Sequence, residues 1–106
     1  MITYANSGWT ALADPTRRTI FELIVEHPCS VGELARDLPV SRPAVSQHLK
    51  VLKDARLVID TRAGKQRIYR IDPDGLAMFR AELDRFWDKT LAAYKLAVEQ
   101  TPEETK

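Results

Sequence analysis

The sequence predicts a mainly α-helical domain that carries one small β-hairpin, an α+β arrangement in the order α-α-α-α-β-β-α. Apolar residues recur at helical spacing through most of the chain, and strand-like runs appear only between residues 57 and 71. The chain has 106 residues, of which 44% are hydrophobic, and this suffices for one small domain. We place that domain at residues 1–100 and a polar tail at residues 101–106.

The N-terminal part of the chain predicts two helices. A short helix is expected from about Tyr4 to Ala13, where Trp9 and Leu12 lie three residues apart and can share a face. Asp14 can cap a second helix, and Pro15 suits its first position because no backbone N–H is required there. The second helix should therefore begin at Pro15.

Two more short helices are predicted, joined by a very short link. Ser30 can cap the first of them, and Glu33 stands three residues later, which is the spacing of a capping box. Ser41 can cap the second, which we expect at residues 41–54. A tight turn between two short helices is typical of a helix-turn-helix motif.

The helix at residues 41–54 has one apolar side and one polar side. Val45, Leu49 and Leu52 recur at i, i+4 and i+7 and should face the core. The other side provides candidate DNA contacts at Ser41, Arg42, Pro43, Ser46, Gln47, His48 and Lys50. Such a face can be merely solvated or can read a ligand, and His48 could instead lie sideways against the following hairpin.

Residues 57–71 predict a hairpin with a basic tip. The runs LVIDTR and QRIYRI are rich in residues that favour strands, and the three residues between them include Gly64. The candidate contacts of this hairpin are Arg62, Lys65 and Arg67. These cations could meet phosphates or a minor groove, or they could simply keep an exposed hairpin soluble.

Charge is concentrated in the middle of the chain, although the formal net charge is only +1. Residues 36–70 hold nine Lys and Arg residues against three Asp residues, which gives them +6 and leaves −5 for the rest. Clustered cations are expected on a surface that meets phosphate. Two short helices joined by a tight turn and followed by a basic hairpin make a winged helix-turn-helix. Such a motif can bind DNA, because a major groove admits one α-helix while a hairpin beside it reaches the backbone.

The last predicted helix, from about Pro73 to Val98, carries more large apolar side chains than a small domain readily covers. The stripe spaced by three or four residues contains Leu83, Phe86, Trp87, Leu91 and Tyr94. This stripe could be core, a ligand pocket or a dimer interface, and we favour core plus dimer interface.

The stretches ALADPTRRTIFELI, SVGELARDLPVSRPAVSQHLKVLKDARLV and RAGKQRIYRID resemble the ArsR-type (ArsR/SmtB-like) family of bacterial winged helix-turn-helix repressors. The resemblance covers roughly residues 9–90. It implies a homodimer in which the first and last helices pair, so that Trp9 and Leu12 join the dimer interface. It also implies that two recognition helices read an inverted repeat in double-stranded DNA, and that an effector releases the DNA.

Many members of that family sense metals, but this sequence departs from their patterns. The third helix has no cysteine pair and the last helix has no histidine, so we expect neither a metal nor a cofactor. Cys29 is the single cysteine of the chain. It leaves open a metal- or redox-responsive repressor, for example through an intersubunit site with His27.

Other function classes have less support. No nucleophile–base pairing or Gly-rich phosphate loop is present, so we do not expect an enzyme. No apolar run reaches the ~18–20 residues of a membrane span. The N-terminal residues do not show the pattern of a signal peptide, and a single cysteine fits a reducing cytoplasm. The alternative is a winged-helix protein–protein interaction module, but phosphate explains clustered cations better than a protein partner does.

Overall fold

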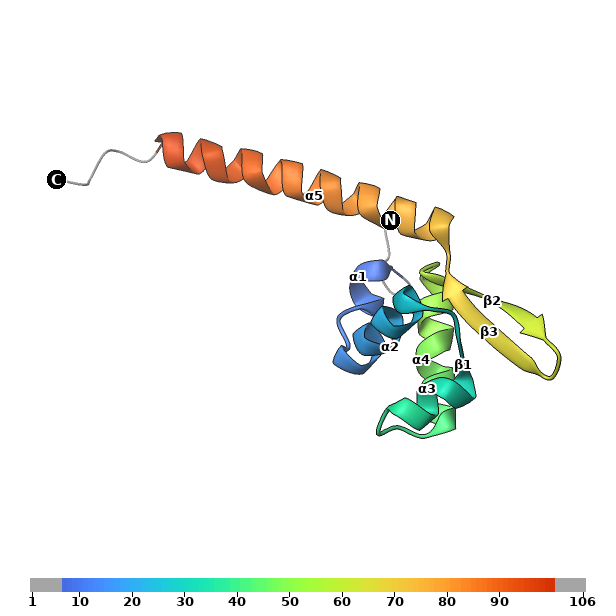
Figure 1. Cartoon of the computed structure of the whole chain (residues 1–106). Helices are drawn as coiled ribbons and strands as arrows, with labels where there is room; N and C mark the ends of the chain where they lie inside the picture. The colour runs from blue at the N-terminus through green and yellow to red at the C-terminus, as the bar shows by residue number, and fades with distance from the viewer. Residues whose placement is uncertain (1–6, 101–106) are drawn as a thin grey trace. The chain divides into compact units, whose positions relative to one another are not determined.

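The computed structural model describes residues 7–100 (Figure 1). The chain divides into two compact units, one ending at Leu76 and one beginning at Ala77. The order of elements is α1-α2-β1-α3-α4-β2-β3-α5, so the predicted series of helices and hairpin is confirmed, with one additional short strand. The start of the first predicted helix and the tail at 101–106 lie outside the described residues.

The first two helices begin near the positions that the sequence indicates. α1 spans Gly8–Ala11 and α2 spans Pro15–Glu26. The carboxylate of Asp14 accepts a hydrogen bond of 2.9 Å from the backbone N–H of Arg17, which satisfies one of the unpaired donors of α2. The cap at the other end of α2 is His27, because a proline follows it.

α3 (Val31–Asp37) and α4 (Arg42–Asp54) form the predicted pair of short helices. The capping box of α3 is present, since Ser30 Oγ accepts from the Glu33 backbone N–H at 3.2 Å and Glu33 Oε1 accepts from the Ser30 N–H at 2.8 Å. Ser41 Oγ caps α4 in the same way, accepting from the N–H three residues on at 3.3 Å.

α4 ends in a Schellman motif. The N–H of Leu57 donates to the Leu52 carbonyl at 3.0 Å, and the N–H of Arg56 donates to the Lys53 carbonyl at 2.9 Å. Arg56 is in the left-handed region with a φ of 63°, at a position that usually takes glycine. The backbone of Gly75 passes so close that a Cβ there would overlap the carbonyl oxygen of Arg56.

The hairpin forms as predicted and gains a third strand. β2 (Val58–Ala63) and β3 (Gln66–Ile71) pair antiparallel, and the positive φ of 66° at Gly64 permits the tight turn between them. β1 (Cys29–Ser30) pairs with the other side of β3, which gives the strand order β1-β3-β2. The sequence prediction omitted β1, because two residues are too few to show strand alternation.

The core of the first unit brings together α2, α3, α4 and the sheet. Its largest fully buried side chains are Ile20, Ile24, Leu34, Val45, Leu49, Leu52, Leu57 and Val58. The inward orientation predicted for the apolar side of α4 is therefore confirmed. Each fully buried aliphatic side chain stabilises the fold by about 1.5–3 kcal/mol, so this stripe fixes which side of α4 faces outward.

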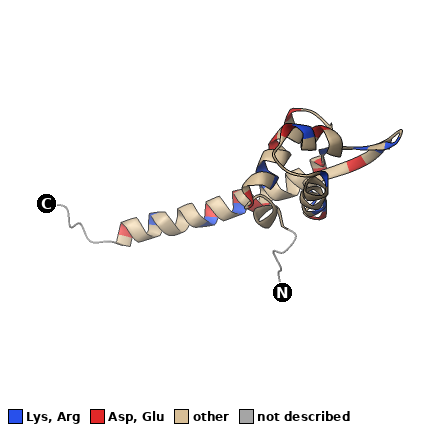
Figure 2. Cartoon of the chain, turned by 90° about the horizontal axis from the view of Figure 1, so that it is seen from below, with Lys and Arg blue, Asp and Glu red and all other residues tan. Residues whose placement is uncertain are grey.

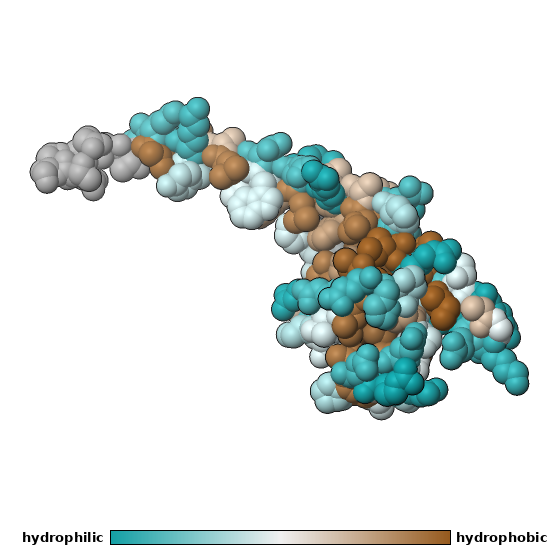
Figure 3. Space-filling view, viewed as in Figure 1, coloured by the Kyte–Doolittle hydropathy of each residue, from teal (hydrophilic) through white to brown (hydrophobic). Residues whose placement is uncertain are grey.

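α5 spans Pro73–Gln100 and is the helix predicted at the end of the chain. Asp72 Oδ1 accepts from the Gly75 backbone N–H at 3.1 Å at the start of this helix. Large apolar side chains remain at the surface along α5 (Figure 3), with exposed fractions of 47% for Phe86, 53% for Trp87, 56% for Leu91 and 68% for Tyr94. None of the helices described between residues 7 and 100 is long and apolar enough to cross a membrane.

Candidate nucleic-acid interface

The polar side of α4 is exposed over most of its length. The apolar side is held in the core, so the opposite side must face outward. Exposed residues of the predicted set are Ser41, Arg42, Pro43, Ser46, Gln47 and Lys50, whereas His48 is half-buried. The structure thus exposes six of the seven residues predicted at 41–54, all but His48.

A groove lies between the start of α4 and the hairpin. The guanidinium of Arg42 rests against α3 at Gly32, where a Cβ would meet Arg42 Nη2 at 3.1 Å. The groove has a volume of about 380 Å³ and is lined by Ser30, Val31, Gly32, Arg42, Ser46, Lys65, Gln66, Arg67 and Tyr69. Three of these lining residues are cations and none is acidic.

His48 faces α2. Its Nδ1 lies 3.3 Å from Nη1 of Arg17, and the Nε of Arg17 donates to the carbonyl of Ala11 at 2.7 Å. A guanidinium can only donate, so this contact is a hydrogen bond in the tautomer whose Nδ1 accepts and whose ring proton lies on Nε2. Sequence reasoning did not find this contact, because the two residues belong to helices far apart in the chain.

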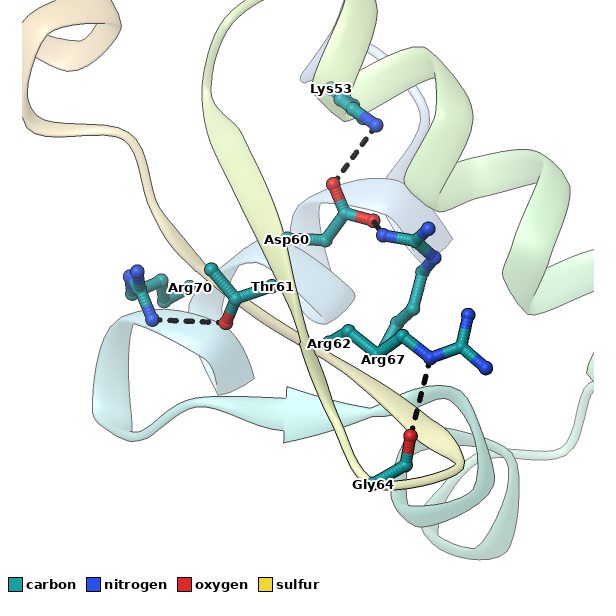
Figure 4. A network of polar contacts seen from close by, with 7 residues as sticks. All are labelled: Lys53, Asp60, Thr61, Arg62, Gly64, Arg67 and Arg70. Atoms are coloured by element: carbon teal, nitrogen blue, oxygen red, sulfur yellow. Dashed lines mark hydrogen bonds and ion pairs between the residues drawn. The ribbon is translucent and has the colours of Figure 1, made fainter.

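The basic tip of the hairpin is exposed and shaped by short-range contacts (Figure 4). Arg62 Nε donates to the carbonyl of Gly64 at 3.3 Å, and Arg62 stands opposite Arg67 in the β2–β3 ladder. Lys65 is exposed in the turn. Arg67 is also exposed, but its Nη1 is engaged by Asp60 Oδ2 at 2.9 Å. The structure therefore places all three predicted cations on the hairpin surface.

A buried carboxylate joins α4 to the hairpin. Asp60 Oδ1 lies 2.9 Å from Nζ of Lys53, and Asp60 Oδ2 lies 2.9 Å from Nη1 of Arg67 (Figure 4). The side chain of Asp60 is only 6% exposed, whereas both cations are about half exposed. The hydrogen bond from Lys53 holds the pKa of Asp60 below its usual value despite the opposing effect of burial. The carboxylate is therefore charged at neutral pH.

Basic residues of the first unit are visible on its helices and along the hairpin, including the far end of the hairpin (Figure 2). Some of these charges have local partners. Lys50 Nζ lies 3.2 Å from Asp54 Oδ2 in an exposed i,i+4 pair. Exposed pairs of this kind contribute only about 0.3–0.5 kcal/mol, so a phosphate can replace the carboxylate at little cost.

Cys29 is buried in β1. The residue is 3% exposed, and burial raises the pKa of its thiol. The Sγ atom lies 3.7 Å from Nδ1 of His27. Within residues 7–100, no three His, Cys, Asp or Glu side chains come together as a metal site requires. A higher pKa leaves less thiolate, which is the form that binds metals and reacts with oxidants.

The residues predicted for a dimer interface lie at α1 and in α5. Trp9 is 38% exposed, and Leu12, which caps the end of α1, is half-buried. In α5 the rings of Phe86 and Trp87 meet edge to face, with 5.7 Å between their centroids. Helical spacing places one stripe along α5 that contains Leu83, Phe86, Trp87, Leu91 and Tyr94.

Known proteins of one family match both the sequence and the fold. A family model described as bacterial regulatory protein, arsR family, matches residues 14–60. The HTH-type transcriptional regulator Rv2034 of Mycobacterium tuberculosis is 56% identical over 107 residues, which cover 99% of this chain and 100% of that protein. The transcriptional repressor SdpR of Bacillus subtilis is 34% identical over 67 residues, or 63% of this chain and 74% of that protein.

A solved structure extends the match to most of the chain. The ArsR-like transcriptional regulator from Rhodococcus sp. RHA1 aligns with a TM-score of 0.71 and 35% identity, covering 92% of this chain and 97% of that chain. The four helices, the β-hairpin and the last helix therefore form a winged helix-turn-helix, in agreement with the sequence prediction. The chain belongs to the ArsR family of bacterial regulatory proteins.

Proposed function

We propose that this chain is a homodimeric repressor that binds an inverted-repeat operator in double-stranded DNA. α4 would lie in the major groove, and the wing, which is the hairpin formed by β2 and β3, would contact the DNA backbone or the minor groove. The observation that carries the proposal is the polar side of α4, which a fully buried apolar stripe holds outward. Residues at the N-terminal end of such a helix reach base edges.

Different side chains of the interface have different roles in this proposal. Gln47 is exposed in α4 and carries both a donor and an acceptor, so it can pair with a base edge, and adenine fits best. His48 offers an Nε2–H donor, because Arg17 occupies its other ring nitrogen. Arg62 and Lys65 on the wing are suited to phosphates, which carry no sequence information.

Dimerisation is proposed through α5 together with Trp9 and Leu12. The side chains of the α5 stripe from Phe86 to Tyr94 are 47–68% exposed, and a second copy would bury them. A dimer would also present two copies of α4 to two half-sites. Repression is supported by the relative SdpR, which is named a transcriptional repressor.

The proposal is tested by selecting bound duplexes from a random pool with the wild-type protein. We expect an imperfect inverted repeat whose half-sites lie about 10–10.5 bp apart or a multiple of that. The affinity for the enriched duplex should exceed that for a scrambled duplex, and both should fall steeply as salt rises. Failure to enrich any duplex, together with salt-insensitive binding to another protein, would favour the interaction-module alternative.

A further inference from the structure

Asp60 occupies a position between the two DNA-binding elements that the proposed function does not explain. Its two carboxylate oxygens each hold one cation at 2.9 Å, Lys53 from α4 and Arg67 from β3 (Figure 4). The ion pairs are therefore the direct polar link from α4 to the wing at this point. The carboxylate is almost completely buried, while the two cations remain open to solvent.

Asp60 binds one side of the Arg67 guanidinium. Arg67 stands on β3 opposite Arg62, and Asp60 binds both Arg67 and Lys53. Without the Asp60 carboxylate, like-charge repulsion would push the Arg67 guanidinium away from Lys53. With Asp60 in place, Arg67 lines the groove that also contains Arg42. Nη1 of Arg67 binds the carboxylate, and a guanidinium has five N–H donors, so others can reach an anion in the groove.

The chemistry of the groove suits a phosphodiester of the DNA backbone. Arg42 of α4 and the two hairpin residues Lys65 and Arg67 contribute positive charge, and Ser46 contributes a hydroxyl, while no acidic residue is among the described lining. The groove lies between the start of α4 and the wing, the two elements that the proposed function places on DNA. An arginine that is already oriented loses less side-chain entropy when it binds phosphate.

We propose that Asp60 is a positioning residue of the DNA interface. It holds Arg67 in the groove beside Arg42, so that the two arginines bind one backbone phosphate. This inference rests on the proposed function. It has an unusual consequence, because Asp60 is itself negative and yet favours binding to a polyanion. Simple electrostatics predicts the opposite sign, since removal of a negative charge near DNA should tighten binding.

The test compares Asp60→Asn with Asp54→Asn, a matched control. Both substitutions remove one carboxylate that is paired with a lysine of α4, but Asp54 is exposed and its pair lies within α4. The probes are the duplex enriched by the wild-type protein and a scrambled duplex of the same length. Asp60→Asn should weaken binding to both severalfold and reduce the salt slope by about two units for a dimer, one for each phosphate that Arg67 no longer binds. Asp54→Asn should leave binding unchanged or slightly tighter.

A double-mutant cycle separates positioning from a general loss of structure. In an Arg67→Ala background, Asp60→Asn should no longer weaken binding, because the side chain that Asp60 positions is absent. Weakening that persists in this background would mean that Asp60 acts through the fold and not through Arg67, and it would overturn the inference. The same holds if Asp60→Asn tightens binding as Asp54→Asn does.

Two further controls keep the result decisive. If Asp60→Asn does not fold, as judged by circular dichroism, the cycle is repeated with Asp60→Glu, which keeps the charge but displaces the carboxylate by one methylene. Asp60→Glu should weaken binding only when Arg67 is present, and unchanged binding would contradict positioning. If the wild-type protein shows no duplex preference at all, the proposed function fails. If the wild type binds the enriched duplex and the Asp60 variant binds it with the same affinity, only the inference about Asp60 is rejected.

Discussion

α4 and α5 carry the same kind of apolar stripe, but the two stripes have different environments. Val45, Leu49 and Leu52 of α4 have no exposed surface, because α2, α3 and the sheet cover them. Trp87 and Leu91 of α5 are more than half exposed. Helical periodicity thus identifies a side of a helix that is suited to burial, but it does not identify what buries it.

The difference assigns separate roles to the two helices. In α4 the chain covers its own stripe, and the polar side is presented outward in a fixed orientation. In α5 the exposed stripe includes aromatic side chains, which are enriched where protein surfaces associate. Under the proposed function, one helix stabilises the monomer and the other stabilises the dimer, and substitutions should separate these two contributions.

The largest effect is expected from Trp87→Asp in α5. A charge placed in the proposed interface would cost several kcal/mol when buried, so the variant should become monomeric and lose affinity for the operator. Sedimentation measures the association state, and titration of the enriched duplex measures binding. Ala92→Asp is the control, because helical spacing places it on the opposite side of α5. A folded monomeric Trp87→Asp variant with wild-type operator affinity would contradict the comparison.

The next effect is expected from Leu49→Ala in α4. Truncation of this fully buried side chain should lower the free energy of unfolding by about 2–5 kcal/mol, because a cavity remains. Leu91→Ala in α5 is the matched change. Its effect on unfolding should depend on protein concentration, because it acts through association. Denaturant unfolding of both variants and the wild type is measured at two protein concentrations. If the loss of unfolding free energy depended equally on protein concentration in the two variants, the two stripes would stabilise the protein in the same way.

Local signals explain why most of the fold could be predicted from the sequence. Asp14 with Pro15, Ser30 with Glu33, and Ser41 are capping patterns that depend only on neighbouring residues, and each forms as expected. The hairpin is predicted in the same way from alternation and Gly64. The Schellman end of α4 was not predicted, because Arg56 occupies the left-handed position where a glycine would have marked it.

The candidate site could be predicted only as a set of residues, not as an arrangement. The exposed side of α4 follows from its period, so the residues on it could be predicted, whereas His48 is half-buried and contacts α2. The Lys53–Asp60–Arg67 ion pairs join the consecutive elements α4, β2 and β3, and the hydrogen bond between Arg17 and His48 joins α2 to α4. Each depends on how whole elements pack against one another, which no spacing pattern within one element encodes. Such interactions arise from packing, which is why the role proposed for Asp60 required the structure.

A smaller effect is expected at Gly75, where the first turn of α5 passes the end of α4. Replacement of a helical glycine by alanine ordinarily stabilises a helix by about 0.5–1 kcal/mol. Gly75→Ala should instead destabilise by about 1–3 kcal/mol, because its Cβ would overlap backbone atoms of Arg56. In the control Gly32→Ala in α3, the nearest atom is the movable end of Arg42, so the ordinary stabilisation should be largely retained. Thermal unfolding of both variants measures this, and a stabilised Gly75→Ala protein would disprove the close approach.

The smallest effect on folding is expected from Gln47→Ala, which changes only the polar side of α4. Gln47 is exposed, so its truncation should leave the unfolding free energy unchanged within about 0.5 kcal/mol. Binding to the enriched duplex should weaken by about 1–3 kcal/mol and binding to the scrambled duplex much less, because the alanine cannot hydrogen-bond to a base edge. Lys65→Ala in the wing is the counterpart, and it should weaken both duplexes alike and lower the salt slope by about one unit for each phosphate that is no longer neutralised. The measurement is affinity for both duplexes across a salt series. If Gln47→Ala weakened the two duplexes equally while Lys65→Ala altered base preference, the base-reading role would belong to the wing and the outward side of α4 would serve only to hold the backbone.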